Sequence, residues 1–163
     1  MNDFTDLFYT IFSVVIFSFL LIQANSLILS NESVAIDHEY EKTAISVAQS
    51  IIDEAKTRDF DINMNSSGIP GTFRDPSQFG TNSLPREQFT AFDDYHIFAN
   101  DPLEVSTPLG DYDVTVQVTY VDDDPPFDIS TVQTMNKRMT VTATSTANNE
   151  IATLVYIKSF FDY

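Results

Sequence analysis

Residues 7–29 read LFYTIFSVVIFSFLLIQANSLIL, and this stretch decides how the rest of the chain is organised. No charged residue occurs from Leu7 to Asn31, and about 20 apolar residues suffice to span a bilayer, so the stretch is long enough for a transmembrane helix. The first basic residue is Lys42. The stretch therefore lacks the basic n-region of a signal peptide and the basic flank of an ordinary anchor, and we hypothesise that a short basic leader is removed before Met1.

The helix is predicted to continue beyond the apolar stretch, because no Gly or Pro occurs before Gly68. After residue 31 the apolar residues recur every three or four positions, which is typical of an amphipathic helix. They are Ile36, Tyr40, Ala44, Val47, Ile51, Ile52 and Ala55. We therefore expect an apolar half-helix over residues 1–30 and, within a globular domain of residues 31–163, an amphipathic half-helix over residues 31–58.

Three segments of alternating residues predict antiparallel strands near the C-terminus. They are residues 111–121 (DYDVTVQVTYV), 137–144 (KRMTVTAT) and 151–158 (IATLVYIK). One face of the first carries Tyr112, Val114, Val116, Val118 and Tyr120, one face of the second carries Met139, Val141 and Ala143, and one face of the third carries Ile151, Thr153, Val155 and Ile157.

The region between helix and strands, residues 59–110, reads as a long loop held down by isolated aromatic residues, among them Phe73, Phe79, Phe89 and Phe92. The predicted fold class is α+β: a long N-terminal α-helix, apolar in its first half and amphipathic in its second, packed on an antiparallel β-sheet meander over residues 111–160.

Composition excludes several function classes. The 163 residues carry 24 acidic and 8 basic side chains, a net charge of −16, so nucleic-acid binding is not expected. The chain has no cysteine. Neither His38 nor His96 lies in a recognisable catalytic motif, and no glycine-rich phosphate loop is present. We therefore expect no enzyme and no cofactor.

Two surface features have a bland and a functional interpretation. Asp122, Asp123, Asp124 and Asp128 form the densest acidic cluster, and oxygen-rich loops suit calcium. The simpler interpretation is a solvated loop that discourages pairing between sheet edges. Asn31 and Asn65 each begin an N-glycosylation sequon, a pattern short enough to occur by chance, and Asn65 in the loop is the better placed of the two.

The layout resembles the type IV pilin superfamily, which includes minor pilins and the pseudopilins of type II secretion. The resemblance lies in the two half-helices, in residues 92–96 (FDDYH) and in the Val/Thr-rich segment 111–124. It implies a structural subunit of an extracellular helical filament, held in the cytoplasmic membrane before assembly. The implied partners are identical subunits, an assembly ATPase, a platform protein and a prepilin peptidase. The implied polymerisation core comprises Phe4, Leu7, Phe8, Ile11, Phe12, Val14, Val15, Phe17, Leu20 and Leu21.

The N-terminus departs from the family pattern. Pilins usually open with Phe-Thr-Leu-Ile-Glu, whereas residues 4–7 read FTDL and no glutamate follows. Asp3 and Asp6 lie within one turn of the missing acid, and we expect them to neutralise the N-terminal amine of a neighbouring subunit. The alternative function is a monomeric, membrane-anchored extracytoplasmic component of a secretion or adhesion system.

Overall fold

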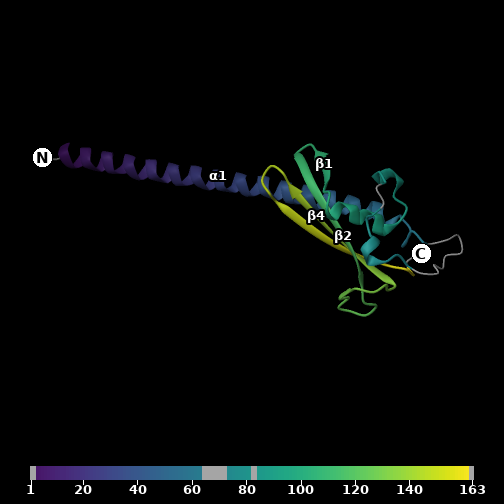
Figure 1. Ribbon diagram of the computed structural model, residues 1–163. Helices are drawn as coiled ribbons and strands as arrows, with labels where there is room; N and C mark the ends of the chain where they lie inside the picture. Colours follow the sequence, from purple (N-terminus) through teal and green to yellow (C-terminus); the bar gives the residue numbers. More distant parts are fainter. Residues whose placement is uncertain (1–2, 64–72, 82–83, 162–163) are drawn as a thin grey trace. The chain divides into compact units, whose positions relative to one another are not determined.

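The computed structural model describes residues 3–63, 73–81 and 84–161 and confirms the α+β class, with a long N-terminal helix packed on a five-stranded antiparallel sheet (Figure 1). Helix α1 covers Asp3–Lys56. Three 3₁₀ helices follow: η1 (Pro76–Gln78), η2 (Arg86–Gln88) and η3 (Phe92–Ala99). The strands are β1 (Leu103–Thr107), β2 (Gly110–Val121), β3 (Ile129–Ser130), β4 (Asn136–Ser145) and β5 (Ile151–Ser159).

The sheet runs in the order β1-β2-β4-β5, with β3 paired to the end of β2. Its centre is the pairing of β2 with β4, in which Val116 lies opposite Val141. The residues predicted to share one face of β2, and those of β4, are all buried at 1% exposure or less. Alternation along the sequence thus identified both central strands and the side of each that faces the core.

The chain divides into two compact units, Met1–Glu39 and Tyr40–Tyr163. In the second unit α1 buries a stripe at helical spacing, formed by Ala44, Val47, Ala48, Ile51, Ile52 and Ala55. Ile36, which we placed in this stripe, is 53% exposed, so the buried stripe begins later than the sequence pattern suggested. The helix ends at Lys56, where the amides of Thr57 and Arg58 turn back to the carbonyls of Glu54 and Ala55 at 3.1 Å.

The sequence analysis predicted the wrong buried face for β5. The face grouped from Ile151 to Ile157 points away from the core, and Ile151 and Val155 are 57% and 58% exposed. The core face is the other one, because pairing with β4 places Ala152 opposite buried Ala143 and Leu154 opposite buried Val141. A strand with apolar residues on both faces takes its orientation from its neighbour, not from its own sequence.

The predicted loop over residues 59–110 contains structure that we did not expect. Strand β1 pairs with β2, with Leu103 opposite Val114, and η3 packs on the same strand. Two prolines, Pro102 and Pro108, flank the five residues of β1. Because proline is disfavoured within strands, these residues were predicted to be part of a loop. The aromatic anchoring is confirmed: Phe79, Phe89 and Phe92 are buried and Phe73 is half-buried.

Candidate functional site

The first candidate site is the apolar surface of α1 in the first unit. Every large apolar side chain from Phe4 to Leu29 is between 45% and 83% exposed, including all ten predicted for the polymerisation core. Among the described residues, α1 is the one helix long and apolar enough to cross a membrane. Each large apolar side chain gains about 1.5–3 kcal/mol when it leaves water. Covering this surface with lipid or with other apolar side chains would therefore be favourable.

Hydroxyl groups along this stretch bond to the helix itself. Thr10 Oγ1 donates to the carbonyl of Asp6 at 2.6 Å, Ser13 Oγ to that of Thr10 at 2.9 Å and Ser18 Oγ to that of Val14 at 2.8 Å. Polar groups satisfied inside a helix can be placed in lipid or against other apolar helices at little cost. The three hydroxyls thus do not interrupt the apolar character of the surface.

The remaining predicted positions on α1 are less informative. Asp3 begins the helix and Asp6 is exposed on it, whereas Met1, whose amine they would face in a neighbour, is outside the described residues. Asn31 is exposed on α1 and Asn65 lies outside the described residues. Their predicted roles in charge neutralisation and glycosylation stay predictions.

The acidic residues after β2 were predicted as a possible calcium site. All four aspartates, Asp122, Asp123, Asp124 and Asp128, are exposed. Asp123 Oδ1 accepts hydrogen bonds from the Asn136 side chain at 3.0 Å and from the Met135 amide at 3.3 Å. Within the described residues no three His, Cys, Asp or Glu side chains are grouped to hold a metal. The calcium prediction therefore gains no support.

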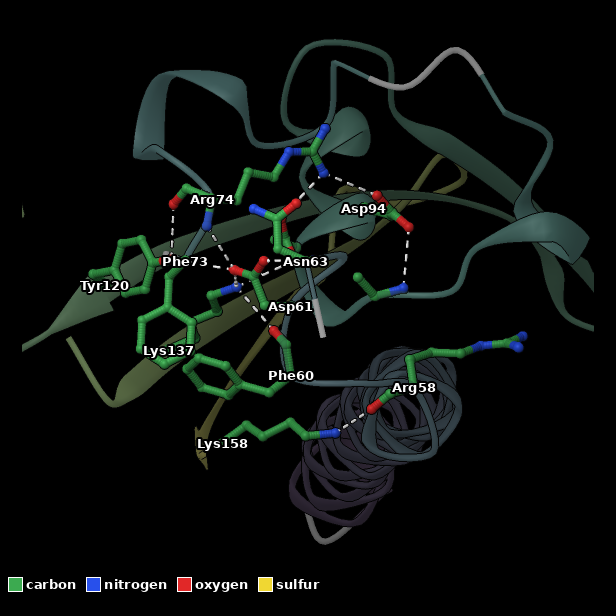
Figure 2. Close-up of polar contacts among 12 residues, drawn as sticks. Arg58, Phe60, Asp61, Asn63, Phe73, Arg74, Asp94, Tyr120, Lys137 and Lys158 are labelled. Carbon is green, nitrogen blue, oxygen red and sulfur yellow. Dashed lines mark hydrogen bonds and ion pairs between the residues drawn. The ribbon is translucent and has the colours of Figure 1, made fainter. Parts of the chain in front are cut away.

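The second candidate site is a buried cluster of charges that the sequence analysis missed (Figure 2). Lys137 enters the core from β4 with no exposed surface, and its Nζ lies 2.7 Å from Asp61 Oδ2 and 3.2 Å from Asp93 Oδ1. The same nitrogen donates to the carbonyl of Phe60 at 2.8 Å. Asp61 and Asp93 are also fully buried, so all three charged groups are removed from water.

Arg74 extends this cluster towards η3. Its Nη1 lies 3.1 Å from both Asp93 Oδ2 and Asp94 Oδ1, and only 5% of the residue is exposed. Asp94 Oδ2 accepts the amides of Thr90 and Ala91 at 3.2 and 3.1 Å, where it fixes the start of η3. The cluster holds two cations and three carboxyl groups, so full ionisation would leave an uncompensated negative charge in the core.

Burial shifts the protonation of groups in and beside the cluster. Removal from water raises the pKa of Asp93, against the opposing attraction of Lys137. It raises the pKa of Tyr120 as well, and the neighbouring charge of Asp61 adds to that shift. Burial lowers the pKa of His96, whose Nδ1 accepts the Val118 amide at 2.9 Å. His96 thus sits neutral in a structural position.

One signal in the sequence could have revealed the cluster. Lys137 is two residues before Met139, so it lies on the same face of the strand as Met139, Val141 and Ala143. The alternation that predicted these residues to face the core therefore also predicted that Lys137 faces it. A buried lysine demands acidic partners. Asp61 and Asp93 are these partners, but nothing in the sequence near either residue indicated that it is buried.

Comparison of the chain with protein-family models, with curated proteins and with solved structures gives no match to any of the three.

Proposed function

We propose that the chain is a structural subunit of an extracellular helical filament of the type IV pilus kind, polymerising through the apolar surface of α1. The observation that carries the proposal is that every large apolar side chain of this surface is exposed, on a helix that continues unbroken to Lys56. In the filament the apolar half-helices of many copies surround one another. Before assembly the same surface is held in the cytoplasmic membrane.

The energetics of the exchange define what the filament contacts must do. Leaving lipid for other apolar helices gives little hydrophobic gain, so association depends on close packing, dispersion and electrostatics near the N-terminus. A head-to-tail contact between identical subunits that does not close into a ring produces an open helical polymer. Extraction from the membrane requires work, which an assembly ATPase and a platform protein would supply.

The second candidate function is a monomeric membrane-anchored component, favoured by the length and composition of the same helix. The two candidates differ in one physical requirement. A lipid-facing helix needs hydrophobicity alone, because lipid chains adapt to its shape. A helix packed among identical helices also needs side chains of suitable size.

A pair of variants on α1 tests the proposal in the native host. Val15→Asp places a charge in the apolar surface and should abolish filaments, with the chain absent from material sheared off the cells. Ala24→Phe keeps the surface apolar but adds bulk, and should reduce filaments strongly while the subunit stays in the membrane fraction. Electron microscopy of sheared material and immunoblots of membrane fractions measure both.

The matched control is Val132→Asp, the same change at a side chain that is 66% exposed outside α1, and it should leave filaments intact. Abundant filaments from both α1 variants would contradict the proposal. A wild-type chain found only in membranes, with none in the sheared fraction, would favour the anchored component instead.

A further inference from the structure

Lys137 and Asp61 lie in contact at a site closed to bulk solvent, because neither residue has any exposed surface. Besides its 2.7 Å contact with Asp61, the amine is enclosed by aromatic rings, whose centroids lie 4.6 Å away for Phe60, 5.0 Å for Phe79 and 5.2 Å for Tyr120. Fixing two groups in reactive geometry replaces a bimolecular encounter with an intramolecular step and so removes much of the entropic part of the barrier.

We propose that the folded subunit catalyses its own cross-linking, in which Lys137 Nζ condenses with the side-chain carboxyl of Asp61 to form an isopeptide bond, with Asp93 as the proton carrier. The new bond joins Nζ to Cγ of Asp61, and the bond from Cγ to Oδ2 breaks. The ammonium and the carboxylate together become a neutral amide and one water molecule. Atoms and charge balance without any oxidant or other reactant.

The hydrogen bonds of Asp61 favour it as the acyl partner. Oδ1 accepts the main-chain amide of Asn63 at 3.0 Å and Oδ2 accepts that of Arg74 at 2.9 Å. Main-chain donors fixed on both oxygens stabilise the negative charge that develops as nitrogen attacks the carboxyl carbon. Tyr120 closes the site, because its hydroxyl lies 3.4 Å from Oδ2 and donates to the Arg74 carbonyl at 2.8 Å.

Asp93 is suited to move protons between the reactants. The amine must lose a proton before it can attack, and Oδ2 must gain protons before it can leave as water. Asp93 Oδ1 is 3.2 Å from Nζ, and Arg74 holds the other oxygen of Asp93 in place. Its raised pKa brings it closer to the pH range in which a carboxyl group can both accept and donate.

Burial also supplies the driving force. An ion pair withdrawn from water carries a desolvation cost for each of its ions. The amide is uncharged, so the reaction removes two of the charges in the cluster. It also leaves Arg74, Asp93 and Asp94 as a smaller ionic group. Lys158 provides the contrast: it is buried too, but its Nζ donates to the main-chain carbonyl of Lys56 at 3.0 Å and to that of Arg58.

Intact-mass spectrometry of the denatured full-length wild-type chain is the primary test. The expected mass is lower than the sequence mass by one water molecule. Trypsin should then release residues 59–74 joined to residues 87–138, because an acylated Lys137 resists cleavage. A chain at full sequence mass overturns the proposal. So does a water loss confined to residues 59–74, which indicates a cyclic imide, or one confined to residues 87–138, which indicates a link to Asp93.

Variants then test the assigned roles, with circular dichroism confirming that each is folded. Lys137→Arg keeps the positive charge but removes the nucleophilic amine, and it should retain full mass. Asp93→Asn is nearly isosteric and should also retain full mass. The control Lys158→Arg should lose water like the wild type. Complete water loss in Asp93→Asn would overturn the role of Asp93, and full mass in Lys158→Arg would overturn the specificity assigned to Lys137.

Discussion

The two units of the molecule place apolar and charged side chains in opposite ways. From Phe4 to Leu29 the first unit exposes every large apolar side chain, whereas the second unit buries Lys137, Asp61, Asp93 and Arg74 among aromatic rings. An exposed apolar surface is incomplete until lipid or other subunits cover it. The buried ionic cluster finds its partners within the chain, because each of its charged side chains contacts an opposite charge from another segment. The first unit therefore has a surface for contacts with other molecules, whereas the second unit satisfies its buried charges within its own fold.

Removal of the first unit should have the largest effect on this comparison. A chain of residues 40–163 retains the compact second unit with its core, including the buried part of α1. We expect it to be a dispersed, folded monomer in detergent-free buffer, with complete loss of filament and membrane association. Analytical ultracentrifugation with circular dichroism measures this. Continued assembly of the truncated chain would mean that the sheet unit, and not α1, carries the polymer contacts.

Disruption of the buried cluster should be next in size. Lys137→Met removes the proposed cross-link and leaves Asp61 buried without the cation it contacts, whereas Asp93 keeps only Arg74. Loss of one member of a buried ionic pair alone costs about 3–5 kcal/mol. Urea denaturation of the 40–163 chain should show this drop in the free energy of unfolding. Lys56→Met is the matched control, because the ion pair of Lys56 with Asp53 is solvated and should contribute far less. Equal effects of the two substitutions would refute the distinction between buried and exposed charges.

Substitutions on the two faces of the sheet should also differ in their effect on stability, with the larger cost on the buried face. Met139 is fully buried, and Met139→Ala should cost about 2–5 kcal/mol of unfolding free energy through lost burial and a cavity. Val155 is 58% exposed on the outer face of β5, and Val155→Ala should change stability by less than about 0.5 kcal/mol. A large cost at Val155 in the dispersed 40–163 chain would show that the outer face of β5 is packed after all.

The smallest expected effect is a pH dependence from His96. Its pKa in the folded chain is below the ordinary value of 6.5, so at lower pH the unfolded chain binds a proton that the folded chain does not. Stability should therefore begin to fall as the pH drops towards 6.5 and continue to fall until the lower pKa of the folded chain is passed, by at most about 1.4 kcal/mol per pH unit. His96→Asn keeps an acceptor for the Val118 amide and should flatten this dependence. An unchanged pH profile in the variant would assign the titration to another group.

Much of the fold could be predicted from the sequence because its main elements have long, regular patterns. The absence of Gly and Pro before Gly68 predicted α1. The alternation of apolar and polar residues predicted β2 and β4 and the correct buried face of each. Strand β5 has apolar residues on both faces, so only its pairing with β4 orients it. Strand β1 is too short and too close to prolines to stand out.

Of the two candidate sites, one could be predicted from the sequence and the other could not. Exposure of the apolar helix follows from a local property of the sequence, its charge-free length, and could be predicted. The buried cluster joins Asp61, Arg74, Asp93 and Lys137 from four separate segments, and only the packed fold brings them together. The one local indication was that Lys137 alternates in phase with the inward-facing residues of β4. This indication is useful only once β4 is known to lie at the centre of the sheet.

Solvent protection of α1 in lipid-free particles tests the central claim most directly. The chain has no cysteine, so Leu20→Cys and Val132→Cys each introduce a single thiol. In sheared, lipid-free material the filament account predicts fibres in which a water-soluble thiol reagent labels position 132 and leaves position 20 unreacted until the fibres are dissolved. Dispersed single chains that are labelled equally at both positions would contradict it.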